Sequence, residues 1–488
     1  MPRSWNHSIV NFVLRQANNK HMGFIVHRFT MKFLIFLLMI SGTGSLLAQK
    51  DTNADSGRIS NMERRTKKQH QEDNNFDPSF LRYTDFIYKE SITSVIFRRE
   101  GWELTPPLIT YGSEERLLLS FDDLDGDYSV WQYTVLHCDA EWNPTDLWQN
   151  EYIEGFTDDF VRDYRFSYNT LQRFTNYSLT IPNENFKFTL SGNYILKVYP
   201  DGQPEKPILT RRFMVVEPRV TVKGMVKAAT PVDLRFTHQE VLFSVYTGNY
   251  KISEPYRDLK VVVQQNARWD NALWGLQPMM LRGEELDYRY TDGTNTFEAG
   301  NEFRYFDIKS LRYQSERVRS FDNRTDGFHV ELQPDKNRAT TPYITYGDIN
   351  GQRLIKTEDA NDATIESEYV WVDFFLPYAA PVTGGGIYIM GALTDWQFAA
   401  PGNSPASASG PGRMEYNFAR QGYQARLYLK QGYYNYLYAY LPDGATKAET
   451  ALVEGNRFET KNSYTVLVYH REPGSRYDRL VAAEVVGN

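Results

Sequence analysis

The sequence has almost none of the residues from which disulfides and metal sites are built. It contains one cysteine, Cys138, among 488 residues, so no disulfide can form within the chain. We expect this thiol to be a small buried apolar group. Only four histidines follow residue 80, each in a different strand-like stretch: His137, His238, His329 and His470. No HExxH motif or Cys/His cluster occurs, so we predict no metal site and no zinc enzyme.

The short motifs of nucleophilic and phosphate chemistry are also missing. The chain has no G-x-S-x-G, no G-x-x-x-x-G-K-[ST] and no G-x-G-x-x-G after a strand. The acidic stretch DDLDGD (Asp122 to Asp127) resembles a calcium loop, but its glycine comes too early and no glutamate closes it. We interpret it as a solvated hairpin turn, with weak calcium binding as the alternative. We therefore predict no catalytic residues, no cofactor and no small-molecule substrate.

Long apolar runs are rare, and the clearest one lies near the N-terminus. MKFLIFLLMISGTGSLLAQ (Met31 to Gln49) has a basic start, an apolar core and small residues up to Ala48, the order of a secretory signal peptide. We expect residues 1–30 to precede the true start, and residues 1–48 to be an upstream extension and signal peptide. Removing them takes five of the 54 basic residues and no acidic one, leaving 49 basic against 61 acidic, a net charge of −12. Such an acidic chain is a poor nucleic-acid binder.

Aromatic residues, by contrast, are abundant. They make up 15% of the chain, with 34 Tyr and 29 Phe, which favours β-structure. After a polar stretch at 49–80, predicted to be a disordered linker, strand-like runs end repeatedly at proline or glycine. In SVWQYTVLHC (129–138) the side chains alternate, with Trp131, Tyr133, Val135 and His137 on one face. The prediction is an all-β protein of tandem immunoglobulin-like or early-set β-sandwiches.

We predict three such units from the turn signals and composition shifts. The first spans 81–218 and the second spans 219–381. The third, at 382–488, is expected to be an early-set-like sandwich, in which the tyrosine-rich run YYNYLYAY forms a half-exposed strand.

One polar and aromatic stretch, HCDAEWNPTDLWQNEYIEGF (His137 to Phe156), is the most informative. It resembles the first-domain signature of the type IX secretion system plug protein family. The resemblance continues through DYRFSYNTLQRFTNYSLTIPNENFKFTLSGNYILKVYPDG (Asp163 to Gly202), about 120 residues in all. The matching steps are His137–Cys138, Trp142–Pro144, Tyr152–Phe156, Ser167–Thr170, Phe174–Tyr177 and Ser191–Tyr194.

The resemblance implies a function without catalysis. Members of the family are periplasmic partners of the giant outer-membrane β-barrel translocon of Bacteroidetes, and they are thought to close its periplasmic opening when no substrate is in transit. On this view the chain is a periplasmic plug, associated with the outer membrane through the translocon. Aromatic residues anchor such contacts, so the candidate partner-binding residues are Trp142, Pro144, Trp148, Tyr152 and Phe156. Alternatively, Trp142 and Phe156 cap the sandwich core.

The third unit offers a second hypothesis. IYIMGALTDWQ and the later YLKQGYYNYLYAYLPDG resemble the glycogen-binding sandwich modules of starch enzymes. In that family aromatic platforms stack on sugars, and here the platforms would be Trp396, Tyr434 and Tyr436. A second platform tryptophan after the PDG turn is missing, so we expect the fold without the ligand. The alternative function is a periplasmic carbohydrate-binding or glycosidase-accessory protein.

Overall fold

The computed structural model describes residues 81–398, 410–445 and 447–487. All of them belong to one compact unit, Thr66–Asn488. The predicted signal peptide and linker, residues 1–48 and 49–80, lie outside the described residues. The described chain is almost wholly β-structure, so the predicted all-β fold of tandem sandwiches is confirmed. None of its helices has the length and apolarity needed to cross a bilayer.

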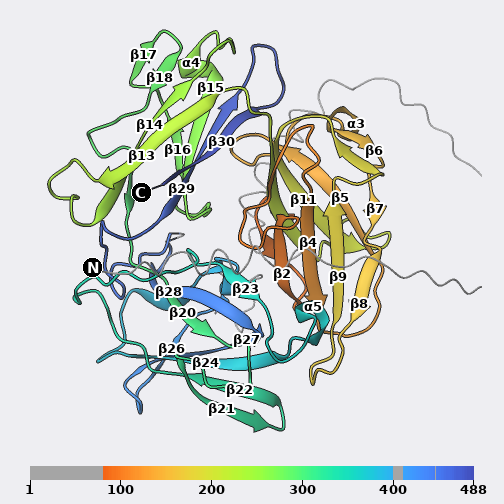
Figure 1. The fold of residues 1–488 in the computed structure, drawn as a ribbon, viewed down its shortest axis with the longest axis vertical. Helices are drawn as coiled ribbons and strands as arrows, with labels where there is room; N and C mark the ends of the chain where they lie inside the picture. Colours follow the sequence, from red (N-terminus) through yellow and green to blue (C-terminus); the bar gives the residue numbers. More distant parts are fainter. Residues whose placement is uncertain (1–80, 399–409, 446, 488) are drawn as a thin grey trace, which may run out of the picture. The chain divides into compact units, whose positions relative to one another are not determined.

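The first sandwich packs two sheets around an aromatic core (Figure 1). One sheet has the order β1 (Phe86–Ile87), β12 (Leu209–Val216), β11 (Gly192–Pro200), β5 (Trp131–Cys138) and β7 (Asp159–Phe160), with β3 (Leu108–Thr110) pairing β12. The other has the order β2 (Ile92–Arg99), β4 (Leu117–Asp123), β9 (Thr175–Ile181) and β8 (Asp163–Phe166). Short α3 (Gln149–Tyr152) leads into β6 (Ile153–Gly155), which pairs β10 (Phe186–Phe188). The alternation predicted for β5 holds: Trp131, Tyr133 and Val135 face this core.

The second sandwich is discontinuous in sequence. Its first sheet has the order β13 (Thr221–Ala228), β14 (His238–Tyr246), β18 (Glu285–Asp287) and β17 (Met280–Arg282), with β19 (Thr296–Glu298) pairing β14. Its second sheet has the order β16 (Leu273–Leu276), β15 (Leu259–Gln265), β29 (Ser463–His470) and β30 (Arg479–Gly487); α4 (Pro255–Asp258) precedes β15. The last two strands of the chain therefore complete the second sandwich.

The third sandwich is inserted into the second, between β19 and β29. One sheet contains β20 (Arg304–Asp307), β28 (Gly432–Pro442) and β23 (Arg353–Ile355), with β25 (Gly385–Met390) also on β28. The other has the order β21 (Val318–Arg324), β22 (Gly327–Leu332), β24 (Tyr369–Pro377), β27 (Gly422–Lys430) and β26 (Glu415–Asn417). Short α5 (Ala363–Glu366) and the 3-10 turn η1 (Ala392–Thr394) lie in its connections. The predicted units 219–381 and 382–488 do not match these sheets. Strands β20 and β23 pair with β28 and β24 pairs with β27, whereas β29 pairs with β15 and β30 pairs with β29.

Two local expectations are corrected by the packing. The tyrosine-rich run is not half-exposed: it forms the buried middle of β28, which has neighbours on both sides. The stretch Asp122 to Asp127 is not a solvated turn throughout. Asp122 and Asp123 end β4 and are buried, because Asp122 forms an ion pair with Lys430 of the third sandwich and Asp123 with Lys89.

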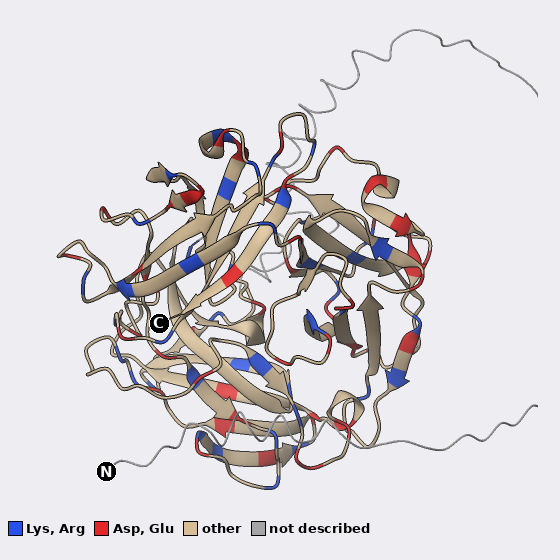
Figure 2. Cartoon of the chain, turned by 45° about the horizontal axis from the view of Figure 1, so that its top comes forward, with Lys and Arg blue, Asp and Glu red and all other residues tan. Residues whose placement is uncertain are grey.

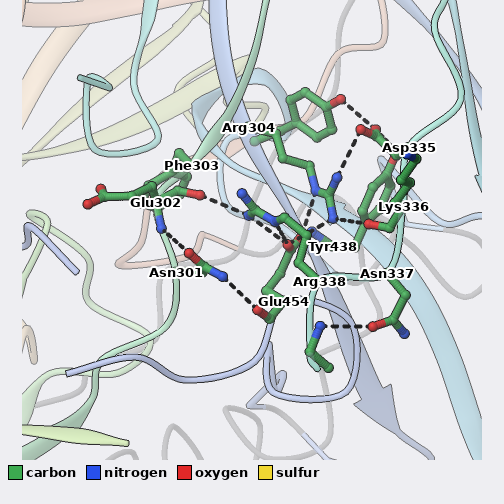
Figure 3. Close-up of polar contacts among 12 residues, drawn as sticks. Asn301, Glu302, Phe303, Arg304, Asp335, Lys336, Asn337, Arg338, Tyr438 and Glu454 are labelled. Atoms are coloured by element: carbon green, nitrogen blue, oxygen red, sulfur yellow. Dashed lines mark hydrogen bonds and ion pairs between the residues drawn. The ribbon is translucent and has the colours of Figure 1, made fainter. Parts of the chain in front are cut away.

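The sandwiches are fastened together in different ways. An apolar cluster that includes Trp142, Met214, Val262 and Tyr469 joins the first sandwich to the second. A buried ionic cluster ties the start of β20 to the segment before β29, where the chain enters and leaves the third sandwich (Figure 3). Between the first and third sandwiches ion pairs and hydrogen bonds accompany an edge-on contact of Phe174 with Tyr369, 5.4 Å between ring centres, and a cavity of about 310 Å³ lies beside them.

Candidate functional site

The most exposed aromatic residue of the first sandwich is Trp148, which is 78% exposed. It immediately precedes α3, and its amide donates to the Glu151 carboxylate at 2.7 Å. Glu151 in turn forms an ion pair with Arg476, whose guanidinium also donates to Asp146 O at 2.9 Å. Arg476 belongs to the β29–β30 hairpin of the second sandwich. Trp148 is thus held outward on a braced turn.

Phe156 lies beside this turn and is 57% exposed. Its amide donates to Asn185 O at 2.9 Å. The preceding Gly155 has φ +121°, and a Cβ there would lie 2.1 Å from the same carbonyl, so this close approach requires glycine. Gln149 links the two sites, because its side-chain amide donates to Thr157 O at 2.6 Å. Of the two alternatives for Phe156, partner contact or core cap, the structure places the ring at the surface.

Exposed aromatic residues continue along the same side of the sandwich. Figure 1 shows α3, β6, β7 and β8 following one another there. The edge strands β7 and β8 and the loop after β8 add four exposed rings: Phe160, Tyr164, Phe166 and Tyr168. We call these four rings, together with Trp148 and Phe156, the acid–aromatic side. Sequence reasoning missed the β8 residues, although the alternation of aromatic and polar residues in DYRFSY (163–168) is a signal that could have found them.

The sequence around these rings is rich in acidic residues, although four of them are paired with basic side chains: Glu141 with Lys260, Glu151 with Arg476, Glu154 with Lys187 and Asp159 with Arg162. Residues 137–163 contain a single basic residue, Arg162, and eight acidic ones: Asp139, Glu141, Asp146, Glu151, Glu154, Asp158, Asp159 and Asp163. Arg162 forms an ion pair with Asp159, so its charge is offset locally. In Figure 2 red segments follow this edge of the first sandwich, with a few blue ones between them. Exposed apolar rings with an acidic surround suit a protein partner that presents basic and apolar groups.

The other predicted partner-binding residues lie elsewhere. Trp142 is buried between the first and second sandwiches, where its ring meets Trp269 edge-on at 5.0 Å and carries the Arg212 guanidinium at 4.6 Å. Tyr152 is buried in the core of the first sandwich. Their rings are therefore not at the surface. Pro144 is exposed and bridges to Cys138.

Beneath this side lies a buried histidine, His137 of β5. Its Nδ1 lies 3.1 Å from Thr145 Oγ1 and its Nε2 lies 3.3 Å from Ser191 O. Burial lowers the pKa of His137 to about 4, although Ser191 O and Asp478 act in the opposite direction. The neighbouring Cys138 is buried, as predicted, and burial raises the pKa of its thiol.

The His137 shift predicts a pH dependence of stability. Because the folded pKa lies below the unfolded value of 6.5, the stabilisation is present above pH 6.5 and is lost as the pH falls toward 4. At about 1.4 kcal/mol per pKa unit, the loss reaches about 3 kcal/mol. Urea unfolding at pH 7.5 and 4.5 measures it. The variant His137→Gln should lose less stability than the wild type over this range; equal losses would contradict the assignment.

The residues of the carbohydrate hypothesis do not form a platform. Tyr434 and Tyr436 are 1% and 0% exposed, and their hydroxyls donate to Lys430 O and to the Asp335 carboxylate. Trp396 is partly buried against Phe303, with the Arg268 guanidinium 5.1 Å from its ring centre. The two tyrosine rings thus have no free face on which a sugar could stack.

Groups suited to metal binding are not assembled either: within the described ranges, no three His, Cys, Asp or Glu side chains are arranged to hold an ion. What the described chain does present is a set of braced β-sandwiches with an exposed acidic and aromatic side. These features define a class of protein built from several β-sandwiches. Its acid–aromatic side is suited to contact with another protein.

Comparison with known protein families identifies part of the chain. Residues 92–217, which include the acid–aromatic side, match the model of the type 9 secretion system plug protein first domain. Residues 92–217 form a domain of this family, as the sequence motifs predicted, and the family supports a role related to type IX secretion in the cell envelope. A search of curated proteins gives no match.

A solved structure is similar over most of the chain. It is the crystal structure of a hypothetical protein from Parabacteroides merdae ATCC 43184, with 33% sequence identity and a TM-score of 0.78. The match covers 84% of this chain and 100% of that one.

Proposed function

We propose that this protein is a non-catalytic periplasmic plug, which binds the outer-membrane β-barrel translocon of the type IX secretion system and closes its periplasmic opening when no substrate is in transit. The observation that carries the proposal is the coincidence of the plug-family domain with the acid–aromatic side. In this proposal Trp148 and Phe156 anchor the contact, and the exposed Pro144 of the same stretch contributes to it.

Physical requirements of a plug support the proposal. A barrel wide enough for folded proteins leaks small solutes unless a rigid body blocks it. Each sandwich here buries its own core, and the apolar and ionic clusters between them limit their relative motion. A specific protein contact buries about 1,600 Å² in total, which is within reach of one side of a sandwich. The acidic surround favours a basic rim on the barrel.

Capture from membranes tests the proposal. A tagged chain incubated with detergent extracts of the outer membrane should retain a very large β-barrel. The double variant Trp148→Ala/Phe156→Ala should weaken binding by about 2 kcal/mol, or roughly 30-fold, because exposed aromatic anchors carry much of the energy of such contacts. The matched control is Phe418→Ala, another exposed ring that lies on the third sandwich; it should bind as the wild type does.

Permeability provides the cellular test. Deleting the gene should let large antibiotics enter through the open translocon, and a chain with the double substitution should restore the barrier poorly. Unchanged permeability in a strain with an active translocon, or no barrel retained by the wild-type chain, would refute the plug function.

A further inference from the structure

β8 is an edge strand whose outer side is available for pairing. It pairs only with β9, in an unbroken register from Asp163–Ser178 to Phe166–Thr175. No other strand among the described residues lies against it. We propose that β8 accepts an extended segment of the partner protein as a fifth strand of the sheet β2-β4-β9-β8. This inference rests on the proposed function and deepens it by naming the mode of contact.

The hydrogen-bond phase shows which main-chain groups are free. Ser167 N donates to Phe174 O at 2.8 Å, one position beyond the last pair of the β8–β9 ladder, Phe166–Thr175. Because hydrogen-bonding pairs alternate along an antiparallel ladder, Asp163 and Arg165 direct their N–H and C=O groups to β9. The same groups of Tyr164 and Phe166 therefore point outward. They are positioned for an incoming strand.

Three other edge strands carry protection of a kind that β8 lacks. Natural edge strands are blunted by bulges, lysines or covering groups. β2 is bulged between Thr93 and Ile96, and Val95 O already accepts from Arg353. The amide of Thr110 in β3 is capped by Glu115, and β13 carries Lys223 and Lys227. β8 contains no lysine, proline, glycine or bulge.

Instead of protection, β8 presents a row of rings. Tyr164 lies 4.5 Å from Tyr128 and 5.6 Å from Phe166, centre to centre, and all three are exposed. These rings share one face of the strand, so an added strand would meet them with every second side chain. On the opposite face Arg165 forms an ion pair with Asp362, whereas the exposed Asp163 forms none within the described part of the chain, although its charge acts on Arg162.

The occupant follows from this chemistry. In the added strand of the partner, the side chains that face Tyr164 and Phe166 are apolar or aromatic. On the other face of that strand, a lysine or arginine lies opposite Asp163. The net acidity of the surrounding surface favours the same charge. Main-chain pairing supplies affinity and the alternating side chains supply specificity, as in other strand-addition complexes.

Two substitutions of Phe166 distinguish the contribution of its ring to binding from that of its main-chain N–H. Phe166→Ala and Phe166→Pro both remove the ring, but only proline removes the outward N–H, and proline is tolerated where that N–H faces solvent. Loss of the ring should weaken capture of the translocon about tenfold. The proline variant should bind a further fivefold to tenfold more weakly, the effect of one main-chain hydrogen bond. Thermal unfolding of both variants checks that each is folded.

Hydrogen exchange supplies a readout that needs no substitution. In the complex of the wild-type chain with the captured barrel, the amides of Tyr164 and Phe166 should exchange at least tenfold more slowly than in the free chain. Capture without this protection, or with equal binding by the alanine and proline variants, overturns strand addition but leaves the plug function standing. A wild-type chain that dimerises alone, and is made monomeric by Phe166→Pro, would assign the edge to a second copy and overturn the inference. Failure of the wild-type chain to capture any barrel would refute both.

Discussion

Replacing Glu454 with glutamine should lower the free energy of unfolding of the third sandwich by about 3 to 5 kcal/mol, because it leaves Arg338 without its carboxylate partner and the buried Arg304 with Asp335 alone. Glu454 is fully buried. Its two oxygens each lie 3.0 Å from a nitrogen of Arg304, and Arg338 Nη2 lies 2.7 Å from Oε2. Glutamine keeps the shape of the side chain but removes the charge that both guanidinium groups need.

The position of this cluster explains why the effect should be large. Arg304 opens β20, just after the chain leaves the second sandwich, and Glu454 lies in the segment that returns to it. Figure 3 shows Arg304 between Glu454 and Asp335. Asp335 also accepts the hydroxyls of Tyr436 and Tyr438. The chain enters the third sandwich near Arg304 and leaves it near Glu454. The cluster therefore attaches both connections to β28, the central strand of that sandwich.

The measurement is urea unfolding combined with hydrogen exchange of β20 and β28. Glu358→Gln is the control, because its ion pair with Lys309 is exposed and should contribute less than 1 kcal/mol. Burial alone would raise the pKa of Glu454, but Arg304 and Arg338 lower it. Its stabilisation is therefore present above pH 4.5 and is lost as the pH falls through the lower, folded pKa. A variant as stable as the Glu358 control would contradict this role.

Local sequence patterns predicted most of the strands but not how distant strands pair. Strand periodicity and turn residues predicted an all-β chain, and the alternation in 129–138 identified the core face of β5. The discontinuous second sandwich was missed because β15 pairs with β29, about 200 residues later, and no local pattern encodes that pairing. The 381/382 boundary was placed at a change in composition, within the third sandwich.

The candidate site was predicted in part for the same reason. Trp142 and Trp148 look alike in the sequence, each in a polar stretch with acidic neighbours. They differ in their contacts with the second sandwich. Trp269 covers the ring of Trp142, whereas Arg476 stabilises the turn from which Trp148 points into solvent. The buried role of Asp122 likewise depends on Lys430, 308 residues away, so a stretch with the composition of a turn ends as part of a buried ion pair.

That ion pair gives the second large effect: Lys430→Met should destabilise the contact between the first and third sandwiches by about 3 to 5 kcal/mol, because it leaves the Asp122 carboxylate buried and unpaired. Lys430 Nζ lies 2.5 Å from Asp122 Oδ2 and donates to Thr364 O at 2.7 Å, and both charged side chains are almost fully buried. Asp122 retains Tyr369 and Asn176 as donors, but neither supplies a positive charge.

A double-mutant cycle isolates the pair from its surroundings. Asp122→Asn alone should also destabilise, since it strands the ammonium group of Lys430 in a buried site. The double variant Asp122→Asn/Lys430→Met removes both charges and should recover most of the loss, because a buried pair contributes little net stability relative to neutral groups of similar size. Hydrogen exchange of β4 and β27 reports whether the contact opens while the cores stay folded. If the double variant lost the sum of the two single effects, the charges would be independent and the pair would not be what joins these sandwiches.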